Sequence, residues 1–149
     1  MSSPEVTARL RSIVVPIDGS HASLQAVGLA CEIARKNKGK VYVVHVIEVK
    51  RHLPLDAALE PEAVVGEAIL AQAEEVGRAH RFEVAGEILQ ARQAGHAIVD
   101  EAVERAADLI VLGLDYPPPF GQFELGSVSQ YVLRSAPCEV WLCRHAVQE

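Results

Sequence analysis

The sequence predicts an α/β fold in which five parallel strands form one doubly wound sheet in the order 3-2-1-4-5. The chain has 149 residues and half of them are hydrophobic, which suits a single domain over 1–149 with its own core. Short apolar runs alternate along the chain with longer segments of helical periodicity. This alternation is typical of a parallel sheet covered by helices on both faces, and right-handed crossovers leave few strand orders.

The first half of the chain is expected to supply two strands and two helices. After a polar, flexible lead over 1–10, residues 13–17 form the first strand, and Ser20 caps a helix that ends at Gly39. Residues 41–47 are β-branched and apolar enough for the interior of a sheet, and a loop follows over 48–61. The apolar stripe of the first helix is Leu24, Val27, Cys31 and Ala34, and that of the second, over 62–81, is Val65, Ile69, Ala73, Val76 and His80.

The second half continues the pattern with three strands and two helices. Residues 82–91 read as an edge strand, and Gly95 and His96 introduce a helix whose opposite face carries the carboxylates Asp100, Glu101 and Glu104, which we expect to be solvated. The buried stripe of this helix is Ile98, Val99, Ala102, Val103 and Ala106. The fourth strand contains the apolar run 109–112, a loop covers 114–125, a helix spans 127–135 with Ser127 and Gln130 at capping-box spacing, and the last strand is 138–143.

Charge and composition exclude several classes of function. The net charge of −6 and scattered Lys and Arg argue against a non-specific surface for nucleic acid or anionic membranes. The N-terminus lacks the features of a signal peptide and no apolar run approaches the roughly 18 residues of a membrane span, so we expect a cytoplasmic protein. Cys31, Cys138 and Cys143 predict neither a disulfide framework nor a thiolate metal site. No histidines pair at metal-ligand spacing and no catalytic constellation stands out, so we expect neither a metal site nor an enzyme.

A candidate ligand site lies where the predicted first and fourth strands end. In the order 3-2-1-4-5 these strands flank the topological switch point, so residues 17–19 and 113–115 should face one another across a crevice. Asp18 either accepts a hydrogen bond from an exocyclic amine such as that of adenine or holds the turn with Gly19, and Val46 supplies apolar contact. After Gly126, the amides of Ser127, Val128 and Ser129 are placed to hold a phosphate, although an ordinary strand-to-helix connection has the same pattern.

The chain resembles the universal stress protein family over nearly its whole length. The matching segments, in order, are IVVPIDGS at 13–20, which includes Pro16 and Ile17, VHV at 44–46, ADLIVLG at 107–113, LGSVS at 125–129 and PCEV at 137–140. The resemblance implies the fold predicted above and, in one branch of the family, a bound ATP or AMP. It also implies a homodimer that is often formed by pairing of the last strands, here 138–143.

One departure from the nucleotide-binding branch of that family changes the expected ligand. The branch has a glycine, two residues, a second glycine, nine residues, and then glycine followed by serine or threonine. Gly113, Gly126 and Ser127 match this spacing, but Tyr116 stands where the middle glycine belongs. Residues 117–119 are prolines without N–H donors, and the loop has no Lys or Arg. We therefore expect a regulatory stress-response domain that binds AMP or adenosine in preference to ATP.

Two alternatives remain open on the sequence alone. In the first, the protein binds no nucleotide and is a dimeric interaction module whose crevice is filled by Tyr116, Phe120 and Phe123 of its own loop. We expect the segment 116–123 to fold inward in this way, unless its aromatics form the docking surface of a partner. In the second, slow ATP hydrolysis or self-phosphorylation takes place at Ser127 or Ser129.

Overall fold

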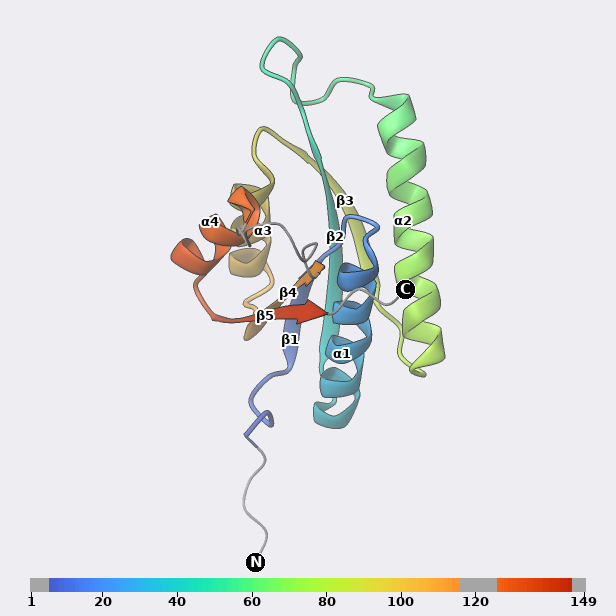
Figure 1. The fold of residues 1–149 in the computed structure, drawn as a ribbon, viewed down its shortest axis with the longest axis vertical. Helices are drawn as coiled ribbons and strands as arrows, with labels where there is room; N and C mark the ends of the chain where they lie inside the picture. Colours follow the sequence, from blue (N-terminus) through green and yellow to red (C-terminus); the bar gives the residue numbers. More distant parts are fainter. Residues whose placement is uncertain (1–5, 116–125, 146–149) are drawn as a thin grey trace, which may run out of the picture.

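Five strands and four helices alternate along the part of the chain that the structure describes (Figure 1). This computed structural model describes residues 6–115 and 126–145. The elements are β1 (Ser12–Pro16), α1 (His21–Asn37), β2 (Lys40–Glu48), α2 (Glu60–Ala79), β3 (Ala85–Ala91), α3 (Ala94–Glu104), β4 (Leu109–Asp115), α4 (Ser127–Ser135) and β5 (Glu139–His145). The β4 strand thus runs two residues into the stretch expected to be a loop, and α2 begins two residues early.

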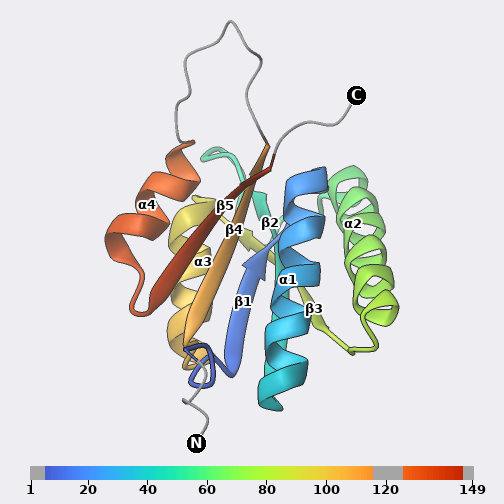
Figure 2. The ribbon, with the colours of Figure 1, turned by 60° about the horizontal axis from the view of Figure 1, so that its bottom comes forward.

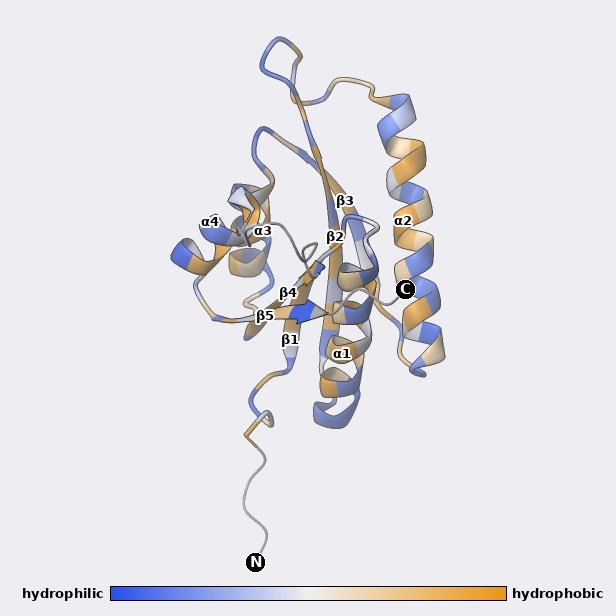
Figure 3. Cartoon of the chain, in the orientation of Figure 1, coloured by the Kyte–Doolittle hydropathy of each residue, from blue (hydrophilic) through white to orange (hydrophobic). Residues whose placement is uncertain are grey.

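All strand pairs are parallel, and the order β3-β2-β1-β4-β5 confirms the predicted fold. Figure 2 shows α1 and α2 on one face of this sheet and α3 and α4 on the other. The core is accordingly divided in two, because successive side chains of a strand point to opposite faces. Ile13 and Val15 pack in the cluster beneath α1 and α2, whereas Val14 packs in the cluster beneath α3 and α4. Figure 3 shows the resulting concentration of hydrophobic residues in the strands.

The ends of α1 show how local chemistry sets a helix boundary. The hydroxyl of Ser20 accepts a hydrogen bond from the amide of Ser23 at 3.1 Å, which confirms the predicted cap. At the other end Lys38, rather than Gly39, adopts the left-handed conformation, with φ of 56°. A β-carbon on Gly39 would lie 2.0 Å from the carbonyl oxygen of Arg11, so glycine is needed there for the close approach of the segment that leads into β1.

Helix α2 has the predicted periodicity but a different buried stripe. Its buried residues are Gly66, Ile69, Ala73 and Gly77, and Val65 is 56% exposed. The helix makes close contacts through its glycines: a β-carbon on Gly66 would lie 3.1 Å from Ile88 Cδ1 of β3, and one on Gly77 would lie 2.7 Å from the carbonyl oxygen of Phe82, in the segment before β3. The expectation that Val65 is buried was wrong. The buried positions of this helix include Gly66 and Gly77, and glycine adds nothing to a hydrophobic pattern, so the sequence pattern did not reveal this face.

Helix α3 departs from its expected pattern in a similar way. Val103 is 62% exposed and Ala106 is also exposed, whereas Glu101, expected in solvent, is only 6% exposed. The buried residues of this helix are Gly95, Ile98, Val99, Glu101 and Ala102. Glu101 tolerates burial because Arg105, one turn later, pairs with its carboxylate.

The start of α4 also differs from the expectation. The helix begins at Ser127, its N-cap is Gly126, and no side chain caps it. The predicted capping box of Ser127 and Gln130 is therefore wrong, since Ser127 already has helical geometry. Among the described residues, no helix combines the length and apolarity that crossing a membrane requires.

Candidate functional site

A cavity of about 350 Å³ opens at the carboxyl ends of β1, β2 and β4, beside the first turn of α4. Its position is the switch point of the sheet, where β1 has β2 on one side and β4 on the other. The cavity brings together every residue that the sequence predicted for the site: Pro16, Ile17, Asp18, Val46, Gly113, Gly126, Ser127, Val128 and Ser129. Their lining of one cavity is observed, and their role in binding a nucleotide stays a prediction.

The inner wall of the cavity is apolar. Val44 and Val46 come from β2, two residues apart and therefore on the same face. Ile98 of α3 and Leu112 of β4 pack in the same cluster as Val128 of α4. Sequence reasoning missed Val44, Ile98 and Leu112, together with Ser23, His45 and Ala94, whereas Leu114 belongs to the segment 113–115 that was expected to face the crevice. The apolar members of this set look like ordinary core residues, and only the period of two in β2 places Val44 beside Val46.

Asp18 holds the turn that follows β1. The Ser20 amide donates to its Oδ1 at 2.9 Å, and Gly19 has a φ of 87°, which favours glycine. Burial by itself raises the pKa of Asp18, but hydrogen bonds from Ser20 and Ser23 outweigh it, and the net pKa is below the ordinary value. The turn-holding role is therefore present, and an ionised carboxylate has lone pairs left to accept a further donor.

His45 fixes the residue that precedes Asp18. Its Nδ1 lies 2.9 Å from the carbonyl oxygen of Ile17. Because a carbonyl only accepts, Nδ1 carries the proton and donates it. The ring also packs on α2, where a β-carbon on Gly66 would lie 3.0 Å from His45 Cδ2. The imidazole thus ties β2, α2 and the end of β1 together.

The two matching glycines have different structural roles. A β-carbon on Gly113 would lie 2.1 Å from the carbonyl oxygen of Ala22, so this glycine permits contact between β4 and the first turn of α1. Gly126 has an extended backbone with φ of −64°, and no atom of the described residues lies within 4 Å of where its β-carbon would sit. The fold therefore requires glycine at 113, whereas at 126 the structure leaves open space beside a helix N-terminus.

The N-terminus of α4 is the anion-binding feature of the cavity. The amides of Ser127, Val128 and Ser129 have no partner within the helix, and the preceding glycine offers no side-chain cap. The hydroxyl of Ser127 is on an exposed residue, while Ser129 is only 6% exposed. No Lys or Arg lines the cavity among the described residues, so backbone amides and the helix dipole supply its positive potential.

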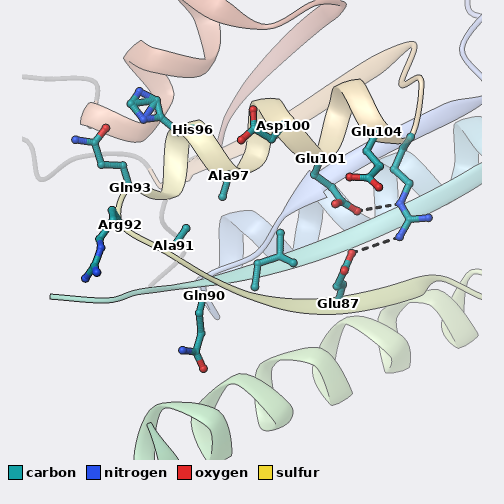
Figure 4. Close-up of a pocket in the computed structure, with 12 residues that line it drawn as sticks. Glu87, Gln90, Ala91, Arg92, Gln93, His96, Ala97, Asp100, Glu101 and Glu104 are labelled. Atoms are coloured by element: carbon teal, nitrogen blue, oxygen red, sulfur yellow. Dashed lines mark hydrogen bonds and ion pairs between the residues drawn. The ribbon is translucent and has the colours of Figure 1, made fainter. Parts of the chain in front are cut away.

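A second cavity, of about 430 Å³, lies between β3 and α3 and has a different character (Figure 4). Arg105 Nε lies 2.9 Å from Glu101 Oε2, and Arg105 Nη2 lies 3.4 Å from Glu87 Oε2. The guanidinium also stacks over the ring of Tyr42, 4.7 Å from its centroid. These groups satisfy one another and join α3 to β3 and β2. Among residues 6–115 and 126–145, no three His, Cys, Asp or Glu side chains gather so as to hold a metal ion.

The two carboxyl groups of this cluster pair with the same guanidinium, that of Arg105. Hydrogen bonding to Glu101, reinforced by partial burial, raises the pKa of Glu87, and Arg105 only partly opposes the rise. The cluster is therefore a structural joint with its own dependence on pH.

The expected inward fold of the segment 116–123, with Tyr116, Phe120 and Phe123, lies outside the described residues. The alternative in which these aromatics fill the crevice therefore stays a prediction.

Comparisons with known proteins agree on one family. A family model described as the universal stress protein family matches residues 9–144. A universal stress protein of Thermus aquaticus is 33% identical over 138 residues, covering 90% of this chain and 98% of the relative. A solved universal stress protein from Archaeoglobus fulgidus in complex with dAMP is 25% identical with a TM-score of 0.71, covering 89% of this chain and 96% of the other. A universal stress protein in complex with cAMP is also 25% identical, with a TM-score of 0.67, covering 91% and 97%.

Proposed function

The chain belongs to the universal stress protein family, and from this premise we propose that its cavity binds an adenine nucleotide with one phosphate in preference to ATP. One observation carries the proposal: a single cavity joins an apolar slot at the carboxyl end of β2 to an uncapped helix N-terminus. Its volume of about 350 Å³ falls within the range of small-molecule sites. The two ends of the cavity match the two chemically different ends of a nucleotide.

The apolar end suits a purine ring. Val46 and Ile98 supply apolar surface for the faces of the ring. Asp18 lines the same cavity, and its ionised carboxylate can accept a hydrogen bond from an exocyclic amine of the base. Adenine carries such an amine and guanine presents a carbonyl at that position, so the carboxylate favours adenine.

The polar end suits a single phosphate. The three amides at the start of α4, which have no partner within the helix, and the exposed hydroxyl of Ser127 can bind one phosphate group without a basic side chain. A triphosphate would bring more charge to a cavity that no described Lys or Arg lines, and residues 117–119 of the adjoining sequence are prolines without N–H donors. The two solved relatives named above are complexes with dAMP and cAMP, each of which has one phosphate.

Calorimetric titration with adenosine, AMP and ATP tests this proposal. We expect AMP to bind more tightly than ATP, and a preference for ATP of about tenfold would overturn it. Gly126→Asp and Gly126→Asn form a matched pair, because both introduce a good N-cap and only the first introduces a negative charge. Gly126→Asp should weaken AMP more than Gly126→Asn does. Adenosine, which has no phosphate, should distinguish the two variants little.

We propose a regulatory role in the cytoplasmic stress response, in which the nucleotide is a signal and is not turned over. Ser129 is 6% exposed, so its hydroxyl is poorly placed to accept a phosphoryl group. Ser127 is exposed and is the remaining candidate for modification at this helix. Incubation with labelled ATP should yield neither steady release of phosphate nor labelled protein, and labelling that Ser127→Ala abolishes would count against a purely regulatory site.

A further inference from the structure

The predicted nucleotide cavity does not end at the first turn of α4. A groove of about 330 Å³ lies between the N-terminus of α3 and the exposed side of α4, and Ala94, Ser127 and Val128 line both spaces. We call it the α3–α4 groove. Because Ser127 and Val128 supply the amides expected to hold a phosphate, the phosphate position lies where the two spaces meet.

We propose that the cavity and the α3–α4 groove together bind a dinucleotide, in which the phosphate of an adenine nucleotide is joined through a second phosphate to another nucleoside. The inference rests on the proposed function, since it assigns the first nucleoside to the cavity. The spaces are nearly equal, about 350 and 330 Å³, so the groove offers room for a second group of similar size. A substituent on a phosphate at Ser127 would enter the groove directly.

Arg134 is the cation available to the second phosphate. It lines the groove, and it makes no hydrogen bond or ion pair with the described residues. It is two turns from Ser127, about 10 Å along the helix axis. Helical side chains lean toward the N-terminus, so the arginine side chain covers part of this distance, and a diphosphate that extends from the junction into the groove covers the rest.

An aromatic corner in the groove suits a second base. The rings of His96 and Tyr131 lie edge to face, with centroids 4.0 Å apart and an interplanar angle of 77°. Tyr131 also packs on α3, where a β-carbon on Gly95 would lie 3.0 Å from Tyr131 Cβ, so the corner is held in place. A ring held in this way offers a face on which any base can stack, because every base has a π-face.

Glu48 determines which helix takes the phosphates. Its Oε2 accepts the amide of Ala94 at 2.8 Å, so a carboxylate already occupies the N-terminus of α3. An anionic group is therefore directed to α4, where no side chain caps the helix. The Glu48 carboxylate remains able to accept a hydrogen bond from an amine or a ribose hydroxyl.

Calorimetric titration of the full chain with AMP, ADP and diadenosine diphosphate tests the inference. We expect diadenosine diphosphate to bind about tenfold or more tightly than either AMP or ADP. Arg134→Gln and, separately, His96→Ala should remove most of this advantage while leaving AMP affinity unchanged. Arg81→Gln, at the opposite end of the sheet before β3, removes the same charge and should change neither affinity.

The outcomes separate this inference from the proposed function. If AMP binds but diadenosine diphosphate gains nothing over ADP, the groove is not a nucleoside subsite and the single-nucleotide function stands. If the advantage is present but survives both Arg134→Gln and His96→Ala, the second nucleoside lies elsewhere and the inference is overturned. If neither ligand binds, both proposals fail.

Discussion

The carbonyl oxygen of Ala22 lies 2.1 Å from the point where a β-carbon on Gly113 would sit. A backbone carbonyl in the first turn of a helix cannot swing aside as a side chain can. The carboxylate of Asp115, two residues farther along β4, accepts the amide of Ala22 at 3.2 Å and draws the same two elements together. The cavity walls formed by β4 and by the turn after β1 are therefore positioned by a contact that only glycine permits.

Replacing Gly113 with alanine should destabilise the protein, because either β4 or α1 must move to admit the methyl group. We expect a loss of about 2–3 kcal/mol in the free energy of unfolding, measured by urea denaturation. Gly126→Ala is the matched control, since no atom of the described residues lies within 4 Å of that β-carbon position, and it should cost no more than about 1 kcal/mol, the usual penalty for alanine at an N-cap. Equal urea midpoints for the two variants would contradict this account of Gly113.

Cys31 should be chemically inert in the native protein. Burial, with a smaller contribution from the charge of Glu32, raises the pKa of its thiol to about 11, so at pH 8 only about one thiol in a thousand is ionised. Cys138 and Cys143 are only half-buried. A thiol reagent followed by mass spectrometry should modify Cys31 only after denaturant is added. Labelling of native Cys31 as fast as that of Cys138 would show that α1 opens readily.

Most strands and helices could be predicted because their signals are local, and the strand order followed from their alternation together with right-handed crossovers. Periodicity placed Val27 and Cys31 on the buried side of α1, and the apolar run 109–112 marked an interior strand. The errors fall where a neighbouring element decides the outcome. Glu101 is buried because Arg105 and Glu87 meet it, and Val65 is exposed because Gly66 takes the contact position. The hydrophobic periodicity of a single helix predicts neither the burial of Glu101 nor the exposure of Val65.

The candidate site also contains residues that local sequence predicts and residues that only tertiary packing brings there. Asp18 and Ser127 were found because a turn after a strand and the start of a helix have recognisable sequences. Ile98 was expected only as a core residue, and its place in the cavity depends on how α3 packs beside β2 and β4. The glycines also needed the structure, since sequence spacing alone treats Gly113 and Gly126 as equivalent.

We propose that the protein forms a homodimer through β5. This strand is an edge of the sheet, and Val140, Trp141 and Leu142 on it are only half-buried, so an apolar edge remains to be covered. Light scattering should give twice the mass of one chain. Val140→Pro, which introduces a residue without an N–H donor, should yield monomer or insoluble protein.

A second variant tests whether loss of the dimer results from a blocked interface and not from misfolding of the chain. Val140→Lys keeps the backbone donor and places a charge on the edge, which disfavours strand pairing. Because Val140 also packs on the cluster beneath α3 and α4, the circular dichroism of this variant is measured together with its mass. A monomer with unchanged circular dichroism supports the β5 interface. If both variants remain soluble dimers, the interface lies elsewhere on the molecule.

The joint between α3 and β3 should make stability depend on pH in a defined direction. Hydrogen bonding to Glu101 raises the folded-state pKa of Glu87 above the ordinary value of 4.5. Glu87 therefore contributes its stabilisation fully below about pH 4.5, and loses it as the pH rises through the folded-state value. Glu87→Gln cannot ionise and keeps a hydrogen-bond donor toward Glu101. Relative to the wild type, this variant should become progressively more stable as the pH rises from 4.5 toward neutrality.

Urea denaturation of both proteins at several pH values measures this difference. Glu104→Gln is the matched control, because it removes a carboxylate from the same helix and cavity without touching the contacts between Arg105 and its two partners. Its stability difference from the wild type should vary less with pH. A Glu87→Gln difference that stays flat, or that shifts toward the wild type with rising pH, would show that the Arg105 guanidinium outweighs the influences that raise the pKa of Glu87. The direction of the slope therefore decides whether the pKa of Glu87 in the folded protein is raised, or is held at or below its ordinary value by Arg105.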